Sequence, residues 1–250
     1  MPALRVIDTD LAHPFRTGAL DEALLRSAAR GAPDTLHVYR RDPSGVSLGY
    51  FGKAAEDVDL DYCGENGIAL LRRLSGGSAI YTDRRQLVYA FATRDGLPTA
   101  PNRAYEKVCG ALVRSFAHLG VEAEFKPIND VQFKGRKLSG SALTRRWGAS
   151  LVHGTVLVEV DRDRMFRALR VDAAKVRAKN LPEPGARVTS LAEILGKAPA
   201  MDAVKASLVK GFEDAFGLEA RNSKLTESEN ELVEKLVRDK YGTDGWNLRR

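Results

Sequence analysis

The sequence has few of the residues that mark secreted, membrane-spanning or metal-rich proteins. Among its 250 residues there are only two cysteines, Cys63 and Cys109, whose spacing matches neither a zinc site nor a disulfide framework. No run of about 18 apolar residues occurs, which argues against a transmembrane helix. The first residues, MPALRVIDTD, are acidic where a signal peptide would have an apolar core. We therefore expect a cytoplasmic protein with reduced cysteines and no membrane association.

Aromatic residues are also scarce, at 7% of the chain, which argues against a stacking platform for single-stranded nucleic acid. Charge is plentiful, and the 39 Lys and Arg residues outnumber the 33 Asp and Glu residues to give a formal net charge of +6. This balance suits an anionic partner such as nucleic acid, a nucleotide or an acidic protein surface. An arginine-rich, solvated surface would give the same balance, so composition does not choose among these alternatives.

The spacing of apolar residues predicts strands in the middle of the chain, with helices before and after them. Helices are expected at 18–30, 103–118, 161–170, 201–216 and 226–241, the last opened by a capping box of Thr226 and Glu229. Strands are expected at 36–41, 45–50, 67–74, 78–82, 87–93, 121–127, 130–143 and 150–160, the last three joined by Lys-Gly and Trp-Gly turns. This order predicts an α+β fold, with a mixed or antiparallel central sheet flanked by helices. We expect one domain over 1–200, and a helical segment over 201–250 packed on it.

The stretch RRLSGGSAI, residues 72–80, combines two arginines with a glycine pair. Gly76 and Gly77 allow positive φ, and successive N–H groups of such a turn can bind an anion. In a strand, Arg72 and Arg73 would point to opposite faces, and the strand phase favours Arg73 as the inward one, with the other solvated. A plain hairpin turn is the alternative.

The stretch NDVQFKGRKLSGSAL, residues 129–143, places Lys137 among residues too small to cover it. Such a lysine could reach an oxyanion, or could simply face solvent in a hairpin. Asn129 and Asp130 could hold a sugar, a base edge or Mg²⁺, or could form a turn. In LVHGTVLVEV, residues 151–160, His153 could line a pocket or be a hydrogen-bonded core histidine.

Taken together and in this order, the three stretches resemble the lipoate–protein ligase family, within a superfamily that also holds biotin ligases and octanoyltransferases. The family pattern is Arg-Arg-x-Ser-Gly-Gly-Gly-Ala-Val, Asn-Asp, Gly-x-Lys-x-x-Gly-Ser-Ala and His-His-Gly-Thr-Leu-Leu. This chain has RRLSGGSAI, IND, GRKLSGSAL and VHGTVL, and its ARVTSLAEIL (186–195) is similar to the family's Arg-Val-Thr-Asn-Leu. The likeness covers roughly residues 4–250 and implies a biotin/lipoate ligase-like catalytic domain.

The resemblance implies a ligase that uses ATP and Mg²⁺. Lipoate, or octanoate, would attack the α-phosphate of ATP to give an acyl-AMP and pyrophosphate. A lysine of a lipoyl-domain acceptor protein would then take the acyl group and release AMP. Both steps develop negative charge on oxygen, which fixed positive charge and N–H donors stabilise.

The resemblance also assigns roles by motif position. Lys137 is expected to bridge the acyl carbonyl oxygen and the α-phosphate, and Asp130 is expected to reach Mg²⁺. The nucleotide and acyl-adenylate would be bound by Arg73, Gly76, Gly77, Ser78, Ala79, Ile80, Tyr81, Asn129 and Asp130. The acyl pocket would be lined by Lys137, Gly140, Ser141, His153 and Gly154.

The chain departs from the family pattern at several positions. Ser78 replaces the third glycine, Val152 replaces the first histidine of the His-His pair, and TDRRQ at 82–86 replaces His-Asp-x-Gly-Asn. Ligases of the family often carry an accessory C-terminal domain, which this chain is too short to hold. We therefore expect a monomer that resembles ligases with a separate accessory-domain protein, or single-domain relatives.

Two alternatives remain. An octanoyl- or lipoyltransferase of the same fold would need no ATP, but would pass the acyl group through an activated cysteine. Neither cysteine stands just ahead of GRKLSGSAL, where those transferases would place it. A noncatalytic basic module is the other alternative. The chain begins with the catalytic-type strand and leaves no room for the added DNA-binding domain of some biotin ligases, so we expect no specific nucleic-acid partner.

Overall fold

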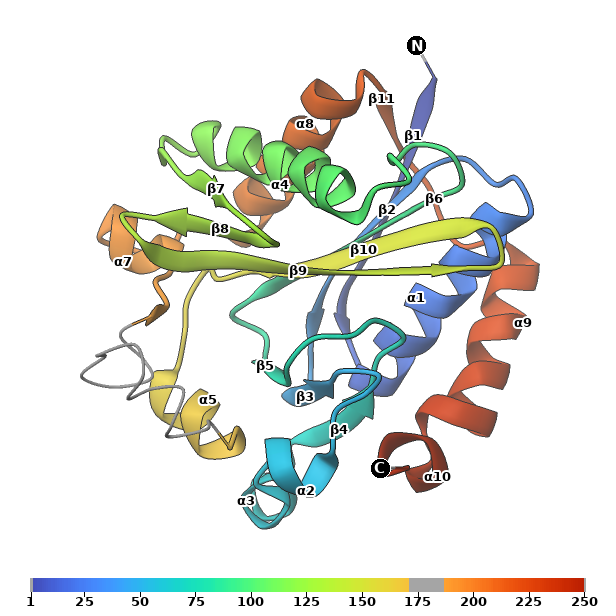
Figure 1. Ribbon diagram of the computed structural model, residues 1–250, viewed down its shortest axis with the longest axis vertical. Helices are drawn as coiled ribbons and strands as arrows, with labels where there is room; N and C mark the ends of the chain where they lie inside the picture. The colour runs from blue at the N-terminus through green and yellow to red at the C-terminus, as the bar shows by residue number, and fades with distance from the viewer. Residues whose placement is uncertain (1, 171–186, 250) are drawn as a thin grey trace.

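The computed structural model describes residues 2–170 and 187–249, and its strands form two sheets (Figure 1). The larger has eight strands, in spatial order β11 (Glu219–Asn222), β1 (Ala3–Ala12), β2 (Thr35–Arg41), β6 (Leu87–Thr93), β10 (Ala149–Val156), β9 (Arg136–Arg146), β8 (Asp130–Phe133) and β7 (Glu124–Lys126). The smaller has three, in the order β4 (Ala69–Arg72), β3 (Gly45–Leu48) and β5 (Ile80–Thr82). In the larger sheet β1 pairs in parallel with both neighbours, whereas the pairings from β2 to β7 are antiparallel. The predicted α+β fold with a mixed central sheet is therefore confirmed.

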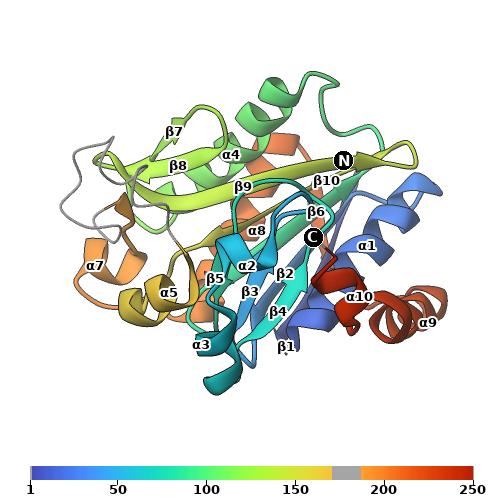
Figure 2. The same cartoon turned by 60° about the horizontal axis from the view of Figure 1, so that its bottom comes forward.

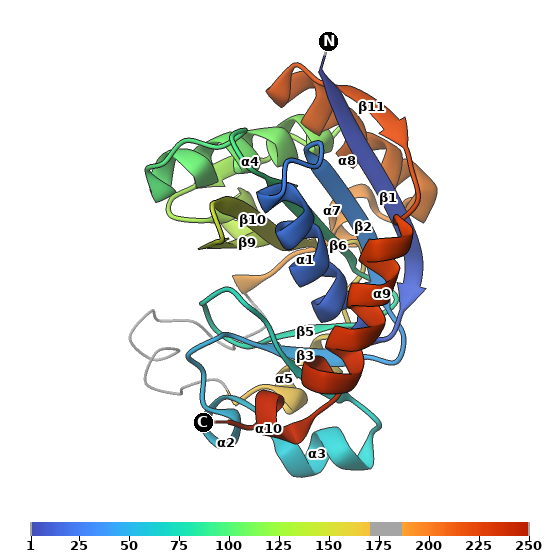
Figure 3. The same cartoon turned by 90° about the vertical axis from the view of Figure 1, so that its right-hand side faces the viewer.

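Helices cover both faces of the larger sheet. On one face lie α4 (Pro101–Ala117) and α8 (Met201–Phe216), while α1 (Pro14–Ala29) lies on the other with α9 (Glu227–Leu236) beside it (Figures 1 and 3). Alternate residues of β6 serve the two cores, since Phe91 packs with Phe212 of α8 and Ala90 packs with Leu24 of α1. Every residue of β6 is buried for this reason.

The smaller sheet lies on the α1 side of the larger one, together with α2 (Ala54–Asp57), α3 (Leu60–Glu65) and α5 (Arg162–Ala168) (Figures 1 and 2). Its own core includes Val46, Tyr81 and Met165. The remaining elements are α7 (Leu191–Leu195), the π-helical turn η2 (Val237–Tyr241) and α10 (Asp244–Asn247). Over residues 2–170 and 187–249, no helix combines the length and apolar character needed to cross a membrane.

Two tight turns organise the hairpins β8–β9 and β9–β10. Lys134 and Gly135 have φ values of 48° and 75°, and Trp147 and Gly148 have values of 57° and 81°. Positive φ at both central positions matches the twist of two-residue hairpins, so the predicted Lys-Gly and Trp-Gly turns are confirmed. These turns place β8, β9 and β10 side by side.

The structure differs from the sequence-based expectations in short elements. The strand predicted at 67–74 is shorter, because β4 ends at Arg72. Helices α2, α3 and α7 were not predicted, since none is long enough to show a helical period. The capping box at the start of α9 is present. The segment 201–250, predicted to be helical, also supplies β11, and the domain boundary at residue 200 stays a prediction.

Candidate functional site

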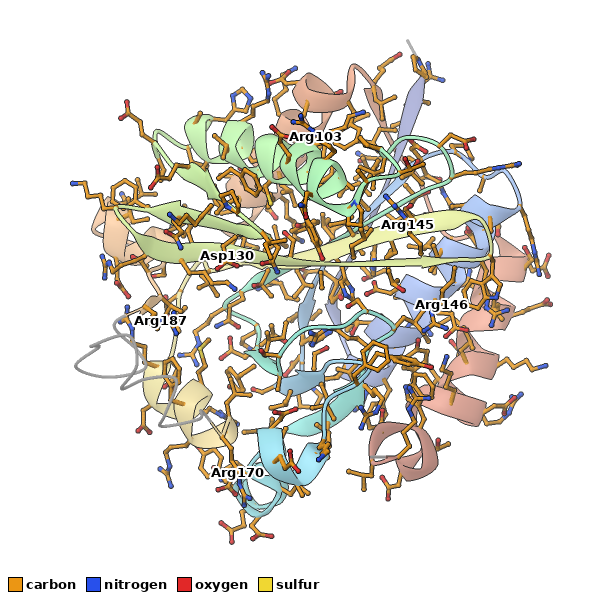
Figure 4. All side chains as sticks on the ribbon, in the orientation of Figure 1. Arg103, Asp130, Arg145, Arg146, Arg170 and Arg187 are labelled. Carbon is orange, nitrogen blue, oxygen red and sulfur yellow. The ribbon has the colours of Figure 1, made fainter. Side chains whose placement is uncertain are left out.

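An ion pair joins Lys137 of β9 to Asp130 of β8, and Figure 4 labels Asp130 on its strand. The distance from Nζ to Oδ1 is 2.7 Å, and the two side chains are 37% and 28% exposed. The next residue, Val131, is buried in the core below α4, so Asp130 points the other way. Because an ammonium group has three N–H donors, this partly exposed Lys137 can also bind an incoming anion.

A β-bulge brings Lys137 over Gly140. Val131 pairs with Ser139 and Gln132 pairs with Lys137, which leaves Leu138 as an extra residue in β9. Residues three apart in a regular strand face opposite sides, but the extra residue turns Lys137 and Gly140 to the same side. A Cβ built on Gly140 would lie 2.3 Å from Lys137 Nζ. The lysine therefore occupies space that only a glycine leaves open.

Both arginines at the end of β4, Arg72 in its last position and Arg73 directly after it, are buried, which corrects the expectation that one of the pair is solvated. Arg72 donates to the carbonyls of Gly52 and Asn247, at 2.7 and 3.0 Å. Arg73 points inward, as expected, but it donates to the protein's own backbone and to Ser75. Strand alternation does not apply here, because β4 ends at Arg72 and the chain turns. Burial and the charge of Arg41 lower the pKa of Arg73 to about 10, so it stays protonated at neutral pH.

The Arg73 guanidinium sets the direction of the peptide groups in the glycine turn, residues 75–79. Its Nη2 donates to the carbonyl oxygens of Gly76 and Ser78, at 2.6 and 2.9 Å. In a trans peptide the C=O and the following N–H point in opposite directions, so the N–H groups of Gly77 and Ala79 point away from the guanidinium. Among the described residues neither amide has an acceptor, and Gly77 is exposed with a φ of 94°. The turn thus presents two N–H donors outward, as an anion-binding nest does.

The loop that follows β3, which contains Gly49 and Tyr50, packs against the backbone of the glycine turn. The amide of Tyr50 donates to the carbonyl of Ser75 at 2.8 Å, and a Cβ built on Gly49 would lie 1.9 Å from the carbonyl oxygen of Gly77. Gly49 is therefore the residue that allows the two backbones to meet.

Gly49→Ala is expected to lower the free energy of unfolding by about 1–3 kcal/mol, because the new methyl group collides with backbone. Denaturant unfolding measures this change. Gly64→Ala is the control, since nothing lies within 4 Å of its built Cβ. Equal stability of the two variants would contradict the close packing of the glycine turn.

His153 of β10 joins the glycine turn to the larger sheet. Its Nε2 is 2.6 Å from the Ser75 hydroxyl, and its Nδ1 is 2.6 Å from Oδ2 of Asp21 on α1. The sequence left His153 either as a pocket residue or as a hydrogen-bonded core residue. The structure shows a buried, hydrogen-bonded histidine on the same side of the sheet as Lys137.

Other predicted site residues lie apart from the Lys137–Asp130 pair. The Ser141 hydroxyl is 2.7 Å from the Tyr89 hydroxyl in the α4-side core, on the face opposite Gly140. A Cβ on Gly154 would also point to Tyr89. The Asn129 side chain donates to the backbone of Ser141 at 2.6 Å. The Tyr81 side chain is buried in the core of the smaller sheet, so only its backbone is available to a ligand.

Ser78 is exposed, and Ala79 and Ile80 are half-buried where the turn runs into β5. Of the segment 186–195, residues 187–195 are described. Val188 forms a parallel bridge with Lys137, so this segment borders the site. The predicted contact between Asp130 and Mg²⁺ stays a prediction, and the described residues contain no cluster of three or more His, Cys, Asp and Glu side chains that could hold a metal.

Both cysteines are buried and protonated. Burial, with a contribution from Asp59, raises the pKa of the Cys63 thiol to about 11 in the core of the smaller sheet. Burial raises the pKa of Cys109 to about 12, and its Sγ is 3.9 Å from the Ser141 hydroxyl. Cys109 is therefore a residue of α4 that faces the core, on the other side of the larger sheet from Lys137.

Sequence reasoning missed Asp21 and Ser75. Asp21 stands between the apolar residues Leu20 and Leu24 of the predicted helix, and this position was the one signal in the sequence. Ser75 was noted only as part of a turn. Their link through His153 depends on three elements that meet only in the folded chain.

One side of the larger sheet thus carries the Lys137 ammonium group and, joined to it through His153, a glycine turn with outward amides, an arrangement suited to binding negatively charged oxygens. The model of the lipoyl protein ligase A/B catalytic domain matches residues 13–213. The chain belongs to this family, and is thus an enzyme of the lipoate ligase and octanoyltransferase group. The match confirms the family that the sequence motifs indicated.

Relatives named as octanoyltransferases and a relative named as a lipoate ligase subunit each match nearly the whole chain. Octanoyltransferase LipM of Brevibacillus brevis is 30% identical over 277 residues, which cover 100% of each chain. Lipoate-protein ligase A subunit 1 of Thermoplasma acidophilum is 34% identical over 243 residues, covering 92% of this chain and 90% of that protein.

Solved structures give the same picture. The bi-partite lipoate protein ligase of T. acidophilum, studied with its E2 lipoyl domain, superposes with a TM-score of 0.88 at 32% identity, covering 99% of this chain and 96% of that one. A lipoate-protein ligase A bound with ATP superposes with a TM-score of 0.85 at 30% identity, covering 99% and 98%.

Proposed function

We propose that the chain is an ATP-dependent lipoate–protein ligase. It would convert lipoate and ATP to lipoyl-AMP and pyrophosphate, and then transfer the lipoyl group to a lysine of a lipoyl-domain acceptor protein. Octanoate is the alternative acyl substrate. The Thermoplasma ligase subunit and the ligase structure with bound ATP support this proposal, because both resemble this chain over almost its full length.

The state of the cysteines is the observation that carries the proposal. A transferase of this fold needs a thiolate beside the acyl group. The chain has two cysteines, and burial raises the pKa of both, to about 11 and about 12. Cys63 lies in the core of the smaller sheet, and Cys109 lies behind the larger sheet. An ATP-dependent route needs no thiolate, since the mixed anhydride is already activated.

Lys137 is the proposed catalytic residue. In the first step the carboxylate of the acid attacks the α-phosphate and pyrophosphate leaves, so negative charge gathers on the phosphate oxygens. In the second step the acceptor amine attacks the acyl carbonyl, AMP leaves and charge gathers on the carbonyl oxygen. A fixed ammonium stabilises both transition states without supplying a nucleophile. Asp130 holds the ammonium at 2.7 Å, over Gly140.

The glycine turn is the proposed phosphate cradle. The N–H groups of Gly77 and Ala79 would donate to phosphate oxygens. Arg73 would support them from the opposite side of the turn, where it donates to the carbonyls of Gly76 and Ser78. This assigns Arg73 a supporting role in nucleotide binding instead of direct contact. Ser78 and Ile80 would border the nucleotide through their backbone.

Asp130 would be the carboxylate closest to a Mg²⁺ ion. Mg²⁺ usually takes one or two protein carboxylates and completes its shell with water and phosphate oxygens. A site with one carboxylate, already paired with Lys137, fits an ion that arrives with the nucleotide. Bound there, Mg²⁺ would neutralise charge on the phosphates.

The second candidate function is octanoyl transfer without ATP, favoured by the full-length similarity to LipM of B. brevis. The double variant Cys63→Ala/Cys109→Ala separates the two functions. We expect it to keep its rate of acceptor acylation from ATP and lipoate, because Cys63 lies in the core of the smaller sheet and Cys109 lies in the core on the face of the larger sheet opposite Lys137. Acylation is followed by the mass of the acceptor. Acyl transfer from an octanoyl carrier that needs no ATP and is lost in the double variant would establish the second function instead.

The partners follow from the same relatives. We propose a lipoyl-domain acceptor, as in the Thermoplasma system, and a separate accessory protein remains an expectation because that ligase is bi-partite. The formal charge of +6 would favour an acidic acceptor surface. Acylation by the chain alone, compared with acylation after addition of an accessory subunit, tests whether the second protein is needed.

A further inference from the structure

A buried row of polar side chains connects helix α1 to the glycine turn. Asp21, His153 and Ser75 are 5%, 7% and 1% exposed, and the two links between them are each 2.6 Å long. They come from α1, β10 and the segment after β4. The row crosses the space between the two sheets and ends at Arg73, whose Nε donates to the Ser75 hydroxyl at 3.1 Å.

The hydrogen bonds between Asp21, His153, Ser75 and Arg73 have a consistent order of donors and acceptors. Burial alone would raise the pKa of Asp21, but the hydrogen bond from His153, with His37 also nearby at 3.9 Å, outweighs it and lowers the pKa. The ionised carboxylate only accepts, so His153 Nδ1 donates to it. The other nitrogen, Nε2, pairs with the Ser75 hydroxyl, which is the donor when the imidazole is neutral. Ser75 in turn accepts from Arg73, so that every donor in the row has an acceptor.

This order fixes where the amides of the glycine turn point. Ser75 is held on one side by His153 and on the other by Arg73, and its carbonyl accepts from Tyr50. The same Arg73 guanidinium holds the carbonyls of Gly76 and Ser78. A rotation of the Ser75 side chain would remove the acceptor of Arg73 Nε and let the guanidinium turn, which would shift the peptide groups that present Gly77 and Ala79 N–H outward.

We propose that Asp21 and His153 are positioning residues that act through Ser75 to preset the glycine turn for the phosphates of ATP. This proposal rests on the proposed ligase function. It differs from catalysis by Ser75 itself, although Ser, His and Asp occur in the same order in serine hydrolases. With 1% exposure, the Ser75 hydroxyl has no space for an acyl group.

The test compares Asp21→Asn, Ser75→Ala and the double variant with the wild-type chain, by pyrophosphate release and by calorimetric titration with ATP. We expect the KM and the dissociation constant for ATP to rise by about 10- to 100-fold in each single variant, with a much smaller change in kcat. The double variant should be no worse than the more affected single one, because the residues act in series.

Thr9→Val is the matched control. Its hydroxyl is 2.9 Å from Nε2 of His37, whose Nδ1 is 3.9 Å from Asp21 on the side away from Ser75. This variant also removes a hydrogen bond, a partly buried one, but it should leave the affinity for ATP within about twofold of wild type. Equal affinity for ATP in all variants, with only the midpoint of thermal unfolding lowered, would overturn the proposal and make the row purely structural.

Two further outcomes are informative. A mass adduct of one acyl group on the wild-type chain that is lost in Ser75→Ala would make Ser75 a nucleophile and also overturn the proposal. If the wild-type chain binds ATP but releases no pyrophosphate, the ligase function fails separately. The positioning proposal is then decided by the titrations, in which weaker ATP binding by Asp21→Asn supports it and unchanged binding contradicts it.

Discussion

Lys137→Ala is expected to lower the rate of pyrophosphate release from ATP and lipoate by about 10²- to 10³-fold. The variant removes the ammonium group that Asp130 holds over Gly140, and with it a charge that would stabilise both transition states. Because the side chain is 37% exposed, its loss leaves the core unchanged and the midpoint of thermal unfolding should move little. The rate is measured with a coupled pyrophosphate assay at saturating ATP.

Lys137→Arg is the comparison that separates charge from geometry. Arginine keeps the charge, but its planar fork does not fit the compact space over Gly140. We therefore expect it to recover only a small part of the lost rate. Full activity of Lys137→Ala would show that Lys137 is not catalytic.

Gly140→Ala is expected to reduce the same rate nearly as much without unfolding the protein. The new methyl group would lie 2.3 Å from Lys137 Nζ and 2.4 Å from its Cε, so the lysine must leave its position beside Asp130. A displacement of about 1 Å in a catalytic group can cost about 10²-fold in rate. Since the colliding atoms are the flexible end of a side chain, the stability should change by less than about 1 kcal/mol.

Two other glycines serve as controls. Gly110→Ala, within α4, meets nothing within 4 Å and should keep full activity, with a slight gain in stability. Gly154→Ala places a methyl group 2.5 Å from the carbonyl oxygen of Gly140, so it should lower stability. A Gly140→Ala enzyme as active as Gly110→Ala would contradict the placement of Lys137.

The fold class could be predicted from the sequence because its signals are local. The apolar pattern of β6, the periodicity of the long helices and the two hairpin turns each depend on residues close together in the chain. The sequence also indicated Lys137 and the glycine turn as site residues, since small residues next to lysine or arginine are visible in the sequence itself. The alternation of a strand predicted one solvated arginine, yet Arg72 is buried. Its acceptors include the carbonyls of Trp246 and Asn247, in a C-terminal segment that no local pattern links to β4.

Two parts of the site required the folded chain. The bulge at Leu138 turns Lys137 toward Gly140, and no residue in the sequence of β9 predicts this bulge. The Asp21–His153–Ser75 row joins side chains from three elements, so each residue alone reads as ordinary core or turn. For the same reason, the buried side of Ser141 became clear only from its contact with Tyr89.

The most direct test of the ligase function is pyrophosphate release by the wild-type chain with ATP, Mg²⁺ and lipoate, in the absence of any acceptor. We expect release that requires the acid and leaves an acyl-AMP on the enzyme, alone or after addition of an accessory subunit. No release under either condition, together with acyl transfer from an octanoyl carrier without ATP, would contradict it.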